Sequence, residues 1–70
     1  MSDEMLFFIY LLEQYAFYRG RKTGEILNEW EQKQLTQRIY DNYWSYHTEC
    51  LQNAFADIDC LLKTGKSAWR

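Results

Sequence analysis

The chain has 70 residues, a formal net charge of −2 at pH 7 and a sequence pI of about 5.2. This length allows one domain at most, and a domain near this size buries only about 60% of the surface of its unfolded chain, so its stability is marginal. The acidic balance argues against broad, non-specific binding of nucleic acid, which depends on clustered Lys and Arg side chains. We therefore expect a small module that gains stability from a protein partner or from homo-oligomer formation.

The first predicted helix ends near Arg19. Ser2 is suited to cap its start, Asp3 and Glu4 suit the positive end of its dipole, and Gly20 supplies a C-terminal stop. Apolar residues surround nearly the whole circumference of this helix, which is typical of a helix buried on most sides. In so short a chain the other helices could hardly cover it completely, so we expect part of it to stay exposed.

The sequence predicts no membrane segment and no secretory signal. The apolar run over residues 5–12 is much shorter than the span of about 20 residues that a bilayer requires. Asp3 and Glu4 stand where a secretory signal would carry basic residues. We therefore expect a cytoplasmic protein.

A basic loop follows the first helix, from Arg19 to Gly24. Arg19, Arg21 and Lys22 form the one basic cluster of the chain. It could contact an anion or an acidic partner surface, although such a cluster is more often a solvated loop. The loop lacks the glycine spacing that cradles phosphates, and no strand precedes it.

Two helices are predicted next, over residues 24–34 and 35–42, with Thr23 as the N-cap of the first. Their apolar residues form two separate stripes, which places a break between them. Two helices joined by a tight turn could imitate a helix-turn-helix, so a small DNA-binding regulator is the alternative function. Acidic side chains on the first of the two would repel DNA, and Arg38 is the only arginine on the would-be recognition helix.

Residues 43–48 are predicted to form a connection, and a fourth helix is predicted from Thr48, its N-cap, to Thr64. Its apolar face has the cleanest helical period in the chain, and Gly65 ends it. Residues 65–70 form a tail that carries Trp69. The predicted fold is therefore all-α, a small bundle of four short helices in a single helical domain over residues 1–64.

The sequence offers no convincing reaction centre. His47 and Cys50 are three residues apart, but no neighbouring residue completes a nucleophile–base–orienter arrangement. Cys50 and Cys60 lie about 15 Å apart if they share one helix, whereas a disulfide needs Cα atoms within about 7 Å, so we expect reduced thiols. A zinc site needs three or four ligands, and no C-x-x-C pair is present. We expect no catalytic residue, no metal and no cofactor.

Thirteen residues are aromatic, which is many for so small an interior. Aromatic side chains dominate both small cores and interface hot spots. We assign Phe8, Trp30 and Phe55 to the core, whereas residues around His47 could fill the core or face a partner. The candidate partner-binding residues are Tyr10, Phe17, Tyr18, Trp44 and Tyr46.

The order of residues resembles a family of short bacterial proteins known as domain of unknown function 3791. The matching elements are Tyr40-Asp41-Asn42-Tyr43, then His47-Thr48, then Asp57-Ile58, together with the glycine after the first helix. The chain departs from the family pattern at Tyr46, where leucine is preferred, and at residues 33–36, where a tyrosine–glycine turn is usual.

The resemblance implies a small cytosolic helical protein, often encoded beside a larger protein that resembles ADP-ribosyltransferase toxins. It implies an antitoxin-like or accessory partner of a toxin enzyme, and it implies no catalytic residue. The sequence therefore favours a non-enzymatic protein-interaction module over a DNA-binding regulator, with an enzyme as the third reading.

Overall fold

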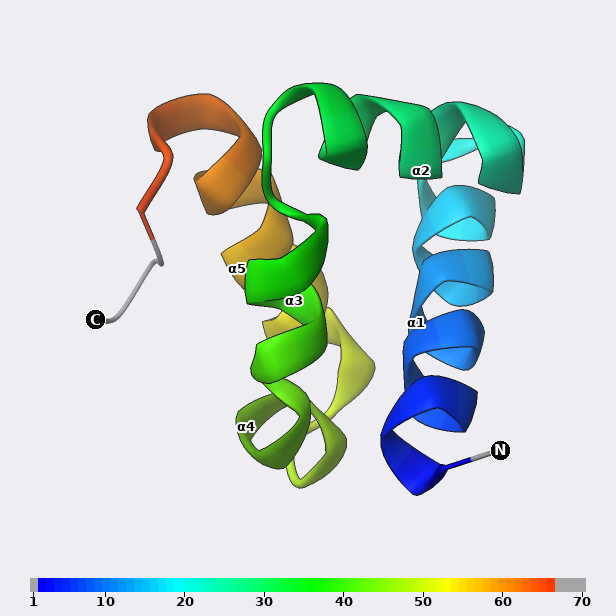
Figure 1. Ribbon diagram of the computed structural model, residues 1–70, viewed down its shortest axis with the longest axis vertical. Helices are drawn as coiled ribbons and strands as arrows, with labels where there is room; N and C mark the ends of the chain where they lie inside the picture. Colours follow the sequence, from blue (N-terminus) through cyan, green and yellow to red (C-terminus); the bar gives the residue numbers. More distant parts are fainter. Residues whose placement is uncertain (1, 67–70) are drawn as a thin grey trace.

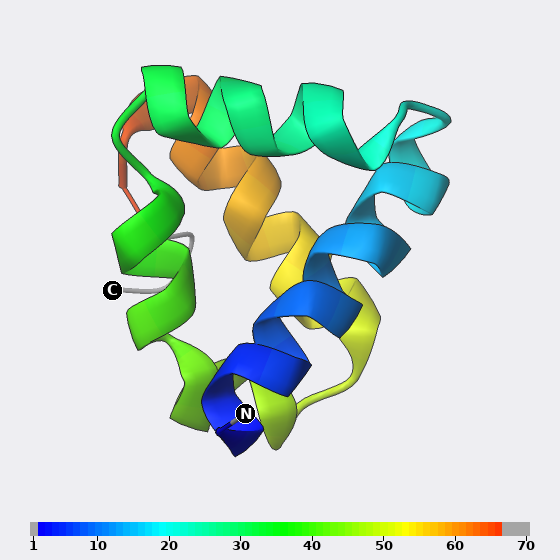
Figure 2. The ribbon, with the colours of Figure 1, turned by 45° about the vertical axis from the view of Figure 1, so that its right-hand side comes forward.

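The computed structural model describes residues 2–66, and this part of the chain forms five helices and no strand. The helices are α1 (Asp3–Arg19), α2 (Thr23–Gln32), α3 (Thr36–Asp41), α4 (Tyr43–His47) and α5 (Leu51–Thr64). Helix α2 lies across one end of α1, and α3, α4 and α5 lie together on the other side of the bundle from α1 (Figures 1 and 2). The predicted all-α bundle is confirmed. Residues 67–70 of the predicted tail, which include Trp69, lie outside the described residues.

Both ends of α1 are formed by the residues that the sequence predicted. The Ser2 hydroxyl accepts a hydrogen bond from the backbone N–H of Met5 at 3.2 Å, so it satisfies one of the free N–H groups of the first turn. Gly20 adopts a left-handed conformation with φ of 66°, and its N–H donates to the last turn of α1. A residue with a Cβ is strained in that conformation, which explains why the helix ends at a glycine.

The N-cap predicted for α2 is wrong by one residue. Lys22 has the extended backbone of an N-cap, and Thr23 is the first helical residue. The break between α2 and α3 lies close to its predicted place. Gln34 turns the chain with φ of 59°, a left-handed conformation for a residue with a side chain, and the N–H of Leu35 then donates to the Trp30 carbonyl at 2.8 Å.

The connection predicted over residues 43–48 contains the short helix α4 instead. Thr48, predicted as the N-cap of the last helix, closes α4: its hydroxyl donates to the carbonyls of Trp44 and Ser45 at 2.9 and 3.1 Å. Cys50 takes the N-cap position of α5 without a side-chain hydrogen bond, so the last helix begins later than predicted. Gly65 ends α5 as predicted, with φ of 76°.

Trp30 lies fully buried in the core and contacts rings from two turns of α1. Phe8 and Tyr15 lie 5.9 and 5.8 Å from it, and Phe55 of α5 packs on Tyr15 at 5.6 Å. Trp30 and Phe55 are buried as predicted, and Phe8 is partly buried against this cluster. The remaining buried apolar residues are Leu11, Leu12, Ala16, Ile26, Leu35, Ile39, Tyr46, Ala54, Ile58 and Leu61.

Candidate functional site

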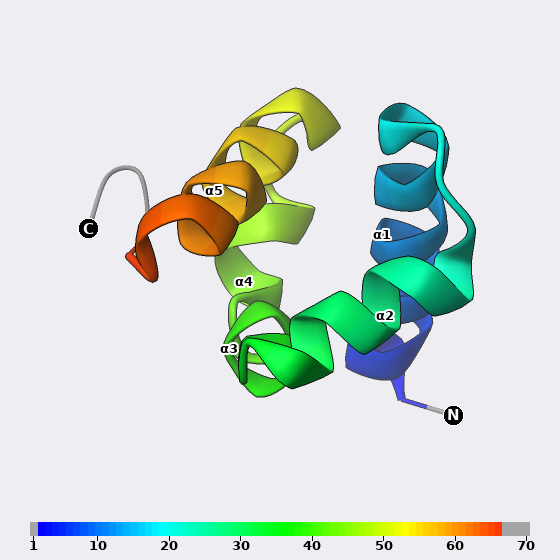
Figure 3. The same cartoon turned by 90° about the horizontal axis from the view of Figure 1, so that it is seen from above.

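The outer face of α1 carries large apolar side chains that no other helix within residues 2–66 covers. We define this outer face by Leu6, Tyr10, Glu13 and Phe17. Leu6 is 53% exposed, Tyr10 48% and Phe17 85%. Figure 3 shows α1 at the edge of the bundle, with its other side turned toward the remaining helices. Helix α1 therefore has two apolar sides. One side lines the core, and the other faces solvent.

A row of touching rings joins the outer face of α1 to α4. Phe7 contacts Tyr10 at 6.4 Å and Tyr43 at 5.6 Å, and Tyr43 contacts Trp44 at 5.5 Å. We call these four residues the aromatic strip. Trp44, at its α4 end, is 73% exposed. The strip therefore links the exposed Tyr10 on α1 to the exposed Trp44 on α4 through the partly buried rings of Phe7 and Tyr43.

His47 supports the α4 end of the aromatic strip. Its ring stacks on Tyr43 at 4.1 Å and lies 5.2 Å from Trp44, nearly edge-on. Its Nδ1 atom lies 2.6 Å from the Tyr43 carbonyl oxygen, one turn earlier in the same helix. These contacts fix the ring against α4, so His47 orients the neighbouring aromatic rings. Cys50 is exposed at the start of α5, and Cys50 and Cys60 are both free thiols.

Tyr46, a predicted partner-binding residue, is not on the surface. Only 1% of it is exposed, and its hydroxyl donates to a carboxylate oxygen of Asp57, which is fully buried. The side-chain amide of Asn42 in turn donates to the Tyr46 hydroxyl at 3.2 Å. A buried carboxylate requires such donors, so Tyr46 acts inside the fold by joining α4 to α5.

Tyr18 is exposed but is also packed within the chain. Its ring stacks on Phe55 of α5 at 4.7 Å, and its hydroxyl makes a long hydrogen bond of 3.4 Å to Asp59. Phe17 and Trp44 thus remain the most accessible of the predicted partner-binding residues, and Tyr10 is 48% exposed. That they bind a partner stays a prediction.

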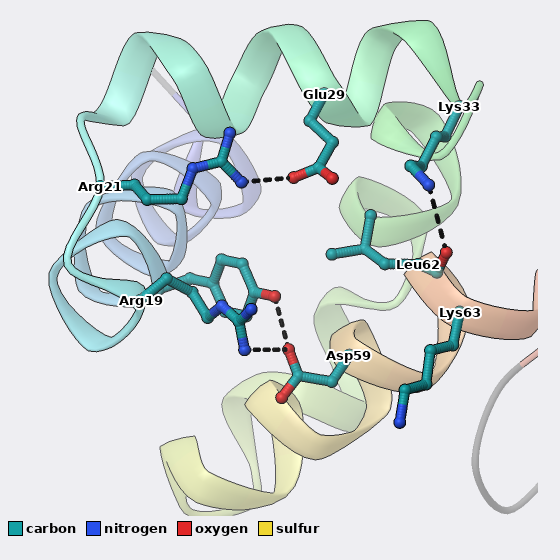
Figure 4. Close-up of a pocket in the computed structure, with 8 residues that line it drawn as sticks. Arg19, Arg21, Glu29, Lys33, Asp59, Leu62 and Lys63 are labelled. Atoms are coloured by element: carbon teal, nitrogen blue, oxygen red, sulfur yellow. Dashed lines mark hydrogen bonds and ion pairs between the residues drawn. The ribbon is translucent and has the colours of Figure 1, made fainter.

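The basic loop borders a pocket of about 250 Å³ between α1, α2 and α5. Figure 4 shows Arg21 pointing at Glu29, and Arg19 pointing at Asp59. The Arg21–Glu29 ion pair measures 2.8 Å, and the Arg19–Asp59 pair 3.8 Å. Because both arginines are paired inside the chain, Lys22 is the one cation of the loop that makes no ion pair within the described residues.

Tyr15 forms the floor of this pocket. Its hydroxyl donates to Asp59 at 2.5 Å, although the two residues are 44 positions apart in the chain. Burial, this hydrogen bond and the negative charge of Asp59 together raise the pKa of the Tyr15 hydroxyl well above its ordinary value. Tyr15 therefore stays protonated and ties α1 to α5 as a hydrogen-bond donor.

The helix-turn-helix reading gains no support from the geometry. Helix α3 has six residues, less than two turns. Arg38, its only arginine, donates to the carbonyl of Gly65 at 2.6 Å and so helps to end α5. Glu25 and Glu31 are exposed on α2, which would oppose an approach to the DNA backbone.

Of the helices within residues 2–66, none is both long enough and apolar enough to cross a membrane. Over the same residues, no group of three or more His, Cys, Asp and Glu side chains is placed to hold a metal ion.

The fold and these surfaces define a small all-α protein with exposed aromatic residues and a core tied by Tyr15 and Tyr46. The family described as "Protein of unknown function (DUF3791)" matches residues 6–65, which is most of the chain, and the protein belongs to this family. No curated protein and no solved structure matches the chain.

Proposed function

We propose that this chain is a non-enzymatic protein-interaction module that binds through the outer face of α1 and the aromatic strip. The observation that carries the proposal is the exposure of Phe17 and Trp44, two large side chains with most of their surface in water. Hot spots at protein interfaces are enriched in aromatic residues of this kind, with Trp and Tyr foremost. Exposed apolar patches of this kind mark interaction sites on soluble proteins.

The aromatic strip is suited to recognition because its rings are already ordered. Phe7, Tyr43 and His47 hold one another by ring contacts of 4.1–6.2 Å, so little conformational freedom remains to be lost on binding. Trp44 adds a polar N–H at the rim of the strip, a group that can be hydrogen-bonded by a partner. A pre-ordered aromatic surface favours a protein partner of complementary shape.

The family resemblance points to one partner to test, the protein encoded beside this chain. An antitoxin-like or accessory role would follow if that protein is a toxin enzyme and the complex blocks its activity. Co-expression of the two proteins, with an affinity tag on the neighbour, tests the proposal directly. We expect the wild-type chain to co-purify and Trp44→Ser to be lost from the complex.

Gln52→Ser is the matched control, because Gln52 is an exposed polar residue on α5 that belongs neither to the aromatic strip nor to the outer face of α1. Circular dichroism of each variant establishes that the fold is retained. Relief of the neighbour's toxicity on co-expression would assign the antitoxin-like role. The proposed function is overturned if the wild-type chain neither co-purifies with the neighbour nor associates with itself in solution.

A further inference from the structure

The outer face of α1 has the residue spacing of a coiled-coil seam. Leu6, Tyr10, Glu13 and Phe17 are separated by four, three and four residues, which is the alternation of a and d positions in a heptad. Tyr15 occupies the opposite side of the helix and is buried in the core. The seam therefore points away from the bundle, and no helix within residues 2–66 covers it.

We infer that the outer face of α1 pairs with the same face of a second copy of this chain, with the two helices antiparallel. This inference rests on the proposed function and names a second copy as the occupant of one of its two surfaces. Such an interface is isologous, so each contact occurs twice about a twofold axis. Charge, register and area favour a second copy as the occupant of this face.

Charge selects the antiparallel direction. Asp3 is exposed at the start of α1, and Lys22 is exposed just after its end. Neither makes an ion pair within the described residues. A parallel pair would place like charges together at both ends, whereas an antiparallel pair brings Asp3 of each copy beside Lys22 of the other. The two helix dipoles also oppose each other favourably in that arrangement.

Register accounts for the one charged residue in the seam. With the twofold axis between Tyr10 and Glu13, Leu6 of one copy lies opposite Phe17 of the other, and Tyr10 lies opposite Glu13. The Tyr10 hydroxyl is then placed to donate to the Glu13 carboxylate of the second copy, and this happens twice. Glu13 makes no hydrogen bond or ion pair of its own within residues 2–66, so the carboxylate is available.

The exposed area fits a weak dimer. An aromatic side chain buries roughly 150–250 Å² when it is fully covered, and Phe17 is 85% exposed while Tyr10 is 48% exposed. With Leu6 and Ile9 added, the two copies together bury on the order of 1,000 Å², the low end for a specific interface. We therefore expect a weak dimer that dissociates on dilution rather than a permanent one.

The test is sedimentation equilibrium of the full chain over a wide concentration range. We expect wild type to pass from monomer to dimer and Phe17→Glu to weaken the dimer at least tenfold, because it places a charge at each end of the seam. Gln52→Glu adds the same charge at an exposed position of α5 and should leave the association unchanged. Leu6→Ser should independently weaken the dimer, because Leu6 lies opposite Phe17 of the second copy in this register.

A charge exchange tests the direction of the helices. Asp3→Lys and Lys22→Glu should each weaken the dimer, and the double variant should restore it, because only the antiparallel arrangement brings these two residues together. A double variant no stronger than either single one would refute the antiparallel pairing. Wild type that stays monomeric at millimolar concentration would overturn self-pairing, while loss of a co-purifying neighbour on Trp44→Ser would still support the proposed function.

Discussion

Replacing Tyr15 with phenylalanine removes one hydroxyl and leaves the ring packing in place. The hydroxyl donates to Asp59 at 2.5 Å, whereas the ring contacts Trp30 and Phe55. A hydrogen bond to a charged acceptor contributes about 1.5–3 kcal/mol. Asp59 keeps some access to water and keeps Arg19 nearby, so we expect a loss of about 1–2 kcal/mol. For a domain of this size that corresponds to a fall in Tm of roughly 5–15 °C.

The same substitution changes how stability depends on pH. Burial and Asp59 raise the pKa of the Tyr15 hydroxyl in the folded protein above the value of about 10 that it has when unfolded. The folded state therefore holds this proton after the unfolded state has lost it. Its contribution to stability is fully present below pH about 10 and is lost as the pH rises from there toward the folded pKa. The difference in the free energy of unfolding between wild type and Tyr15→Phe should therefore become smaller at alkaline pH.

Urea denaturation followed by circular dichroism, at neutral pH and above pH about 10, measures both effects. Tyr18→Phe is the matched control, because the Tyr18 hydroxyl makes only a long, exposed hydrogen bond to the same carboxylate. We expect its effect to stay within about 0.5 kcal/mol. The reasoning is refuted if Tyr15→Phe is as stable as wild type at neutral pH, or if the difference grows as the pH rises.

Two further substitutions test the helix ends and the buried polar pair. Gly20→Ala should lower stability by about 1–2 kcal/mol in thermal melts, because the φ of Gly20 is left-handed. Gly24→Ala is the control: Gly24 lies within α2, so its replacement should be neutral or stabilise by up to about 1 kcal/mol. Equal effects of the two substitutions would contradict the role of Gly20. Tyr46→Phe should lower the free energy of unfolding by about 1–3 kcal/mol in urea denaturation, because Asp57 loses a buried hydrogen-bond donor. Tyr43→Phe should lower it by less. Equal losses in the two tyrosine variants would contradict the importance of this hydrogen bond.

The helix ends marked by glycine could be predicted from sequence because their cause is local. Gly20 and Gly65 both adopt the left-handed conformation that ends a helix, and Ser2 caps α1 as expected. Helix α4 could not be found in the same way. Its residues, including Tyr43 and Trp44, show no apolar stripe of their own, because one side packs on α1 and the other carries the exposed end of the aromatic strip.

The misplacement of Tyr46 has a tertiary cause. The sequence predicts Tyr46 as a partner-binding residue, and a charged residue such as Asp57 is ordinarily expected at the surface. In the structure each is buried because of the other, since the hydroxyl supplies the hydrogen bond that a buried carboxylate requires. They belong to different helices, so no periodicity within either helix reveals the pair.

One side of helix α1 lines the interior of its own chain, and the other side is the surface that we infer to pair with a second copy. In a complete substitution scan along α1, the positions that affect folding and the positions that affect association should therefore form two series. Each series should follow the helical repeat, and the two should lie on opposite sides of the helix. Changes near Leu11, Leu12 and Tyr15 would reduce the amount of folded protein in cells, whereas changes at Leu6 and Phe17 would leave that amount intact and alter only what the protein assembles with. Substitutions at Leu6 and Phe17 should thus alter association with little effect on the core, because neither residue belongs to the buried cluster.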